Sequence, residues 1–173
     1  MITSHSSEEL RGWLAGRLPQ DWFAEEPTVT IDRDEIVIVG RIDEPKTADG
    51  IAPDEKAAAV AGRIKQFRVD TRDARIRIAR ELEHATARKV AWGVVCGDTT
   101  RIFTSLAAPV MTRLRQPERQ ILDTLVDAGV ARSRSDALGW CVKLVGKNAD
   151  SWLSDLRAAM DGVAKVREEG PGV

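Results

Sequence analysis

The segment from Pro53 to about Arg88 most constrains the fold, because it has the pattern of one long amphipathic helix. Pro53 and the acidic residues after it suit a helical first turn, and Gly62 is the single glycine of the segment. Apolar or small side chains recur every three or four residues, which predicts one continuous stripe on a helix. The stripe consists of Val60, Ile64, Phe67, Thr71, Ala74, Ile78 and Leu82.

Two predicted β-hairpins flank this helix. The first joins residues 28–31 to residues 35–42 through a turn at Asp32-Arg33-Asp34, and the return strand is apolar on both faces at residues 36–39. The second joins Lys89–Cys96 to Arg101–Ser105 around residues 97–100. We therefore expect the return strand of the first hairpin to be buried in a sheet.

A short helix is predicted before the first hairpin, from hydroxyl caps at Ser6 and Ser7 to about Leu18, where Pro19 stops it. Residues 1–106 thus have the order helix, hairpin, long helix, hairpin. This order predicts an α+β domain, whose role the sequence does not indicate.

Charge is segregated along the chain although the net charge is only −1. Residues 56–115 carry 13 Lys and Arg against 5 Asp and Glu, whereas residues 1–55 carry 5 against 13. A basic segment of this kind favours contact with a polyanion, or it faces the acidic segment within one fold. Within it, four cations share one face of the long helix, either as a solvated face tied down by Asp70 and Asp73 or as a secondary phosphate-facing stripe. These cations are Lys65, Arg68, Arg72 and Arg75.

Composition excludes several classes of protein. The chain lacks the low hydrophobicity of disorder, an apolar run long enough for a membrane span and a secretory signal, so we expect a cytoplasmic protein. Two cysteines and two histidines cannot build a disulfide framework or a four-ligand zinc site. Because no phosphate loop or nucleophile motif occurs, we expect no catalytic residues, no metal and no cofactor, and hence no enzyme.

Residues 107–173 have a different order of elements. An alternating strand is predicted at Val110–Arg115, and Pro117 lies in the first turn of a helix that ends at Ala128-Gly129. A second helix begins at Ser133-Arg134-Ser135-Asp136, and a third covers Asp150–Glu169. Trp140 and Trp152 are predicted to lie in a core or a dimer interface rather than to stack on bases.

The order strand, helix, helix resembles the ribbon-helix-helix (Arc/MetJ-like) family of bacterial DNA-binding repressors. The resemblance covers about residues 109–147, and its most specific piece is LDTLVDAGVARSRSDAL. It implies that two chains pair their strands into an antiparallel ribbon, which enters the major groove of DNA. It also implies that the N-terminus of the second helix lies on a phosphate.

The resemblance assigns roles to individual residues. The strand positions that face outward are Met111, Arg113 and Arg115, of which Arg113 would pair with a guanine edge. Either the first helix begins early, with Arg115 in the place of the family's proline, or the strand is displaced by two residues. A displacement of two keeps Arg113 outward and leaves the position of Arg115 open. The phosphate clamp would consist of Ser133, Arg134 and Ser135.

These patterns predict a homodimeric, DNA-binding transcriptional regulator, with a ligand or protein partner on residues 1–106. An antitoxin-like repressor is a narrower version. One alternative is a non-catalytic interaction protein that uses the ribbon-helix-helix unit for dimerisation only, with the basic helix at 63–89 binding RNA or a protein. Another is a winged-helix-like reader with residues 135–145 as recognition helix.

Overall fold

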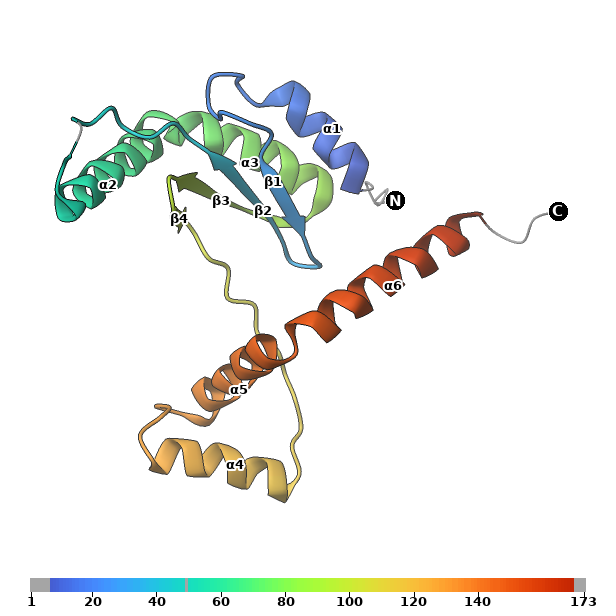
Figure 1. Cartoon of the computed structure of the whole chain (residues 1–173). Helices are drawn as coiled ribbons and strands as arrows, with labels where there is room; N and C mark the ends of the chain where they lie inside the picture. The colour runs from blue at the N-terminus through green and yellow to red at the C-terminus, as the bar shows by residue number, and fades with distance from the viewer. Residues whose placement is uncertain (1–6, 49, 170–173) are drawn as a thin grey trace. The chain divides into compact units, whose positions relative to one another are not determined.

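The computed structural model describes residues 7–48 and 50–169, and the chain divides into two compact units, Met1–Pro109 and Val110–Val173. The fold is mixed α+β, with one four-stranded sheet and six helices among the described residues (Figure 1). No helix in the described part of the chain combines the length and the apolar character needed to cross a membrane.

The sheet of the N-terminal unit has the strand order β1-β2-β3-β4. The strands are β1 (Thr28–Ile31), β2 (Glu35–Arg41), β3 (Lys89–Cys96) and β4 (Thr99–Ile102). Each predicted hairpin forms an antiparallel pair, and the two hairpins join through the parallel pair β2–β3, with Ile38 opposite Trp92. A parallel pair requires a long crossover, and the helical segment after β2 provides it.

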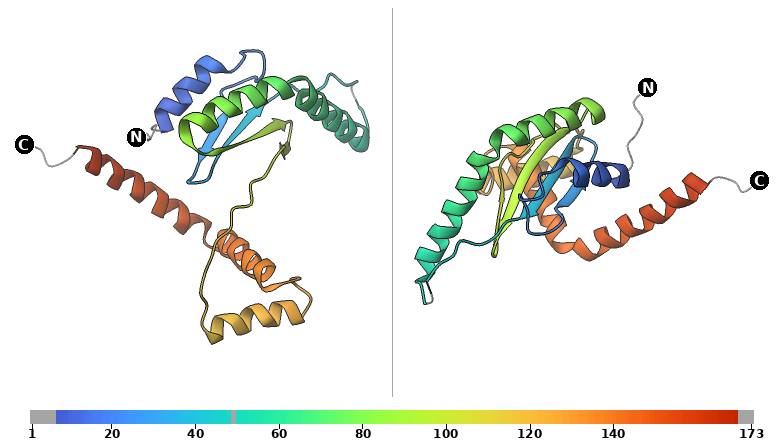
Figure 2. Two further views of the ribbon diagram at one scale, coloured as in Figure 1. Left: turned by 180° about the vertical axis from the view of Figure 1, so that it is seen from behind. Right: turned by 90° about the horizontal axis from the view of Figure 1, so that it is seen from above.

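Helices cover one face of this sheet. They are α1 (Ser7–Arg17), α2 (Pro53–Asp70) and α3 (Arg72–Thr86), all drawn on the same side of the strands in Figures 1 and 2. α1 and α3 pack on the side chains of Ile36, Ile38 and Trp92, and α2 packs on Val94 and Cys96. A fully buried Ile or Leu contributes about 1.5–3 kcal/mol, so these clusters hold the unit together.

The predicted long helix is two helices, with the break at Thr71. The Thr71 hydroxyl donates to the carbonyl of Phe67 at 2.6 Å and accepts from Nε of Arg75 at 2.9 Å. A threonine that bonds back to its own helix favours a local break in the ladder. The predicted stripe itself is confirmed, because all of its members are buried except Ala74, which is half-buried.

The second hairpin differs in register from the prediction. β4 begins at Thr99 and ends at Ile102, so the turn is Gly97-Asp98 rather than residues 97–100. Gly97 has φ +56°, and a Cβ there would lie 3.1 Å from the Glu44 carboxyl group, so the tight turn depends on glycine. For the first helix, the predicted cap Ser6 lies outside the described residues.

The C-terminal unit consists of α4 (Gln116–Asp127), α5 (Arg134–Asn148) and α6 (Asp150–Glu169), close to the predicted bounds. The strand predicted at Val110–Arg115 is absent from the single chain, and β4 does not pair with it. Residues 109–114 make no backbone hydrogen bond to another described segment, and a strand exists only where a second segment provides those bonds.

Candidate functional site

The segment before α4 is exposed and has one anchored side chain. Leu114 is half-buried against the small core of the C-terminal unit, whereas Val110 and Met111 are 84% and 95% exposed. Arg113 and Arg115 are also exposed, and no described carboxylate lies within ion-pair distance of either. The side chain of Leu114 therefore points inward, as predicted, and its two basic neighbours are free to contact an anion.

The first residue of α4 is relevant to the two positions of the ribbon strand that the sequence leaves open. α4 begins at Gln116, directly after Arg115, whose extended backbone makes it the N-cap residue. Arg115 is thus at the helix boundary, while Arg113 lies two residues inside the extended segment.

The turn between α4 and α5 has the geometry that the sequence predicts. Gly129 has φ +72°, the left-handed conformation that favours glycine after a helix. The Ser133 hydroxyl caps α5 by accepting from the backbone N–H of Asp136 at 3.2 Å. The Asp136 carboxylate accepts from the backbone N–H of Arg132 at 3.0 Å, which lowers the pKa of Asp136.

Arg134 makes a bidentate ion pair across the two helices. Its Nε and Nη2 donate to the two carboxylate oxygens of Asp123 at 2.6 and 2.8 Å. These hydrogen bonds lower the pKa of Asp123 and raise the pKa of Arg134. The pair fixes the predicted clamp residue against α4 and leaves its Nη1 donors unengaged by described residues. The neighbouring Ser135 is exposed at the same helix end.

Most of the apolar surface of this unit is exposed. Among the residues of this unit whose burial is described, Leu122, Ala131 and Ala137 alone are buried, whereas large apolar side chains on all three helices face solvent. Trp140 and Trp152 are 40% and 59% exposed, so neither lies in a core of the single chain. The exposed set also includes Ile121, Val142, Leu144, Val145, Leu156, Met160, Val163 and Val166.

The four cations predicted to share one helix face are separated by the break at Thr71. Lys65, Arg68 and Arg72 are exposed, and Arg72 pairs with Asp73 at 3.2 Å, as the solvated-face interpretation expected. The prediction is wrong for Arg75, which is only 8% exposed. Arg75 lies on the buried side of α3, next to Thr71 and Ile78, and its Nη2 donates to the carbonyl of Arg68 in α2 at 2.6 Å.

The family of the chain follows from comparison with known proteins. Residues 8–102 match the family model described as "Rv1265-like protein, N-terminal domain", and residues 115–167 match the model "Mb1296 C-terminal domain". The chain belongs to the Rv1265-like family. The relatives Rv1265 of Mycobacterium tuberculosis and Mb1296 of Mycobacterium bovis are each 53% identical over 159 residues, covering 92% of this chain and 69% of theirs. No solved structure gives a significant match.

The two family matches coincide with the two units of the fold. One lies within the sheet-containing unit and the other within the helical unit. Neither the family descriptions nor the names of these relatives state an activity. The geometry and charge of the residues are therefore what indicates a function.

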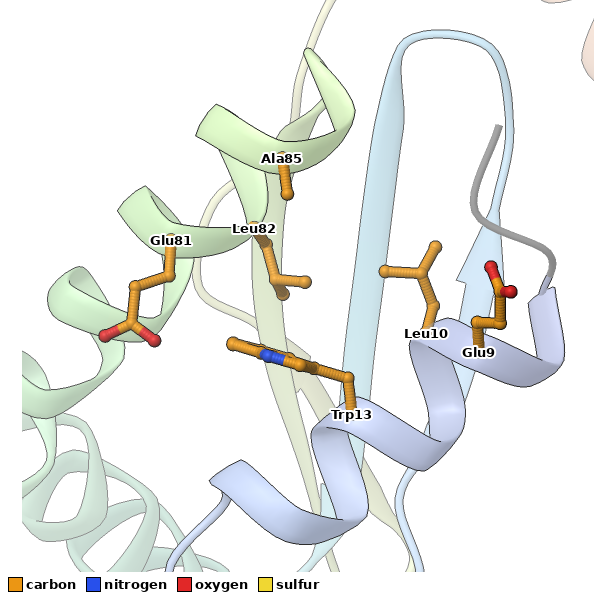
Figure 3. A pocket seen from close by; sticks show the side chains of 6 residues that line it. All are labelled: Glu9, Leu10, Trp13, Glu81, Leu82 and Ala85. Carbon is orange, nitrogen blue, oxygen red and sulfur yellow. The ribbon is translucent and has the colours of Figure 1, made fainter. Parts of the chain in front are cut away.

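A hollow of about 380 Å³ lies between α1 and α3 of this Rv1265-like chain (Figure 3). The Trp13 ring extends toward Leu82 and Ala85, and Glu9 and Glu81 lie at the rim. The Glu81 carboxylate already holds Arg17 through two hydrogen bonds of 2.7 and 2.9 Å. Because that acid is engaged, the hollow is an apolar packing site between two helices rather than a charged binding site.

The sequence-based predictions missed Arg101 and Phe103, which lie beside the basic row. Phe103 has Arg75 4.8 Å and Arg68 5.6 Å from its ring centroid. The sequence could have predicted their position, because alternation along β4 puts Arg101 and Phe103 on the face of the sheet that carries Val94 and Trp92.

Proposed function

We propose that this protein is a homodimeric DNA-binding regulator that pairs the segment before α4 with its copy in a second chain. The observation that carries the proposal is the incomplete core of the C-terminal unit. The extended segment at residues 109–114 makes no backbone–backbone hydrogen bond to another described segment, and its only backbone hydrogen bond to a described side chain joins the Leu114 carbonyl to Arg119. The described part of the unit that follows has a buried cluster of three residues. Exposed main-chain groups of this kind favour pairing with a second strand.

Pairing two such segments would explain which side chains the chain leaves exposed. In an antiparallel ribbon, Val110, Thr112 and Leu114 would lie over the helices, and Leu114 already does so. Met111 and Arg113 would then face outward. A two-stranded ribbon fits the major groove, where an arginine can donate two hydrogen bonds to guanine.

The start of α5 supplies the phosphate contact in this proposal. The backbone N–H groups at the start of a helix attract an anion, and Ser133, Arg134 and Ser135 surround this one. Because Asp123 holds Nε and Nη2 of Arg134, the Nη1 group is the part of the guanidinium that would reach a phosphate. Asp123 is thus expected to position Arg134 and also to reduce its attraction for phosphate.

A salt titration of duplex binding tests the proposal. We expect Arg113→Gln to weaken discrimination between sequences by about 1–3 kcal/mol, and Arg134→Gln to weaken all sequences and reduce the salt slope by about 1. The matched control is Arg33→Gln, an exposed arginine in the β1–β2 turn. Equal effects of all three substitutions, or a monomer by sedimentation equilibrium, would contradict the proposal.

A second candidate is a non-catalytic protein that dimerises through the same unit and binds RNA or a protein partner through its basic helix. It is favoured by Lys65 and Arg68, which have no carboxylate partner among the described residues. The same titration separates the two functions. A stable dimer without duplex binding at low salt would support this second candidate.

A further inference from the structure

A groove of about 330 Å³ runs between α2 and the edge strand β4 of the N-terminal unit. Its apolar wall includes Val60 and Ile64 of α2 and the Phe103 ring just beyond β4. The cations Lys65 and Arg68 line it from the helix. The strand adds Arg101 and Thr99.

The lining contains three cations and no acid. Within the described residues, Lys65, Arg68 and Arg101 form no ion pair, although other basic side chains of the same unit do. Arg17 and Arg41, for example, bind Glu81 and Glu25 at 2.7 and 2.9 Å. The groove is therefore lined by basic side chains without a carboxylate among its lining residues.

Arg75 adds a fourth cation behind the Phe103 ring. It is 8% exposed, and its hydrogen-bond partners are the Thr71 hydroxyl and the Arg68 carbonyl, which carry no charge. Burial lowers the pKa of Arg75, and the charges of Arg68 and Arg72 lower it further. Buried charges in proteins are normally paired with an opposite charge. An anion in the adjacent groove would supply it.

We propose that this groove binds a small phosphomonoester that carries an apolar ring. Three cations at one opening favour a dianion over a carboxylate, and the planar guanidinium groups of Arg68 and Arg101 suit phosphate oxygens. The side chains of Val60 and Ile64 would contact the ring. The volume is at the lower end of the range for small-molecule sites, which fits one ring rather than an oligonucleotide.

This site is independent of the proposed DNA interface. All of its residues lie within Met1–Pro109, whereas the ribbon and the start of α5 belong to the other unit. Failure of duplex binding would therefore leave the groove proposal intact, and failure of the groove proposal would leave the DNA proposal intact.

The test is a titration of the full chain with phenyl phosphate, followed by amide chemical shifts. We expect saturable shifts along Thr99–Ile102 and in α2, no saturable shift with neutral benzyl alcohol, and at least tenfold weaker binding of inorganic phosphate. Arg68→Gln and Arg101→Gln should each weaken phenyl phosphate at least tenfold. Arg80→Gln, which removes an exposed cation of α3 outside the groove, should leave the affinity unchanged.

Three results would overturn the proposal. Equal affinity for inorganic and phenyl phosphate would show a general anion surface without a place for the ring. Displacement of phenyl phosphate from β4 by RNA or duplex DNA at equivalent phosphate concentration would show a polyanion surface. Unchanged affinity in Arg68→Gln and Arg101→Gln, with circular dichroism confirming that both variants fold, would place the ligand elsewhere.

Discussion

The two units of the chain differ in how far each completes its own core. The N-terminal unit buries clusters of eight and six residues between its helices and one face of its sheet, whereas the C-terminal unit buries three. A small unit needs a substantial buried core or a partner to be stable. Among the described residues, the first unit therefore has the more complete core, and the second would gain more from a partner.

The exposed apolar residues make the same distinction. Val69 is an isolated exposed apolar side chain on α2, which is ordinary for a protein surface. On α5, by contrast, four large apolar side chains are exposed within six residues, and a helix with this much exposed apolar surface favours contact with a partner. They are Trp140, Val142, Leu144 and Val145. The number of exposed large apolar side chains on its described helices is thus what most sharply separates the C-terminal unit from the N-terminal unit.

The largest effect is expected from Val145→Asp. If a second copy covers α5, the substitution buries an unpaired charge at a cost of about 3–5 kcal/mol, which weakens the dimer by more than about 100-fold. The matched control is Val69→Asp, a similarly exposed valine on a helix of the other unit. Sedimentation equilibrium measures both, and equal dissociation constants for the two variants would remove α5 from the interface.

Smaller changes in stability, opposite in sign, are expected from substitutions of two glycines in the C-terminal unit. Gly129 has φ +72° and open space around it, so Gly129→Ala should destabilise the unit by about 1 kcal/mol through backbone strain alone. Gly162 lies inside α6 with the same open space, so Gly162→Ala should stabilise its helix by about 0.5–1 kcal/mol. Urea unfolding at one fixed protein concentration compares them, and shifts of the same sign would contradict the opposite backbone roles assigned to the two glycines.

Sequence patterns predicted well the elements whose determinants are local. The apolar stripe from Val60 to Leu82, the Gly129 turn and the Ser133 cap each depend on residues a few positions apart, and each is present. The break at Thr71 was missed because a threonine on the buried stripe satisfies helical spacing whether or not its hydroxyl bonds to Phe67. The spacing of apolar residues does not show whether this hydrogen bond forms.

The candidate sites depend on contacts between distant segments, and these were predicted less well. Arg75 belongs to a basic row by spacing, but its position against Phe103 follows from how α3 packs on the sheet. The Arg134–Asp123 pair likewise joins residues eleven positions apart on two helices. The proposed strand at Val110–Arg115 would need a second chain to pair with, and the single chain has no strand there.

The smallest expected effects concern the stability that each unit loses at low pH. Hydrogen bonds from Arg134 lower the pKa of Asp123, and hydrogen bonds from Arg17 lower the pKa of Glu81. A carboxylate with a lowered pKa stabilises the folded state above its ordinary pKa, and this contribution is lost as the pH falls through the lowered value. Both units should therefore lose stability below about pH 4, each through its own ion pair.

Single substitutions separate these contributions. Asp123→Asn should reduce the acid sensitivity of the C-terminal unfolding transition only, and Glu81→Gln should reduce that of the N-terminal transition only, because each removes one titrating partner. Asp127→Asn is the control, since it removes an exposed carboxylate of α4 that has no ion pair among the described residues. Thermal unfolding between about pH 2 and pH 6 measures the effect. If Asp123→Asn also altered the N-terminal transition, the two units would share one cooperative core, and the contrast between a complete and an incomplete unit would no longer hold.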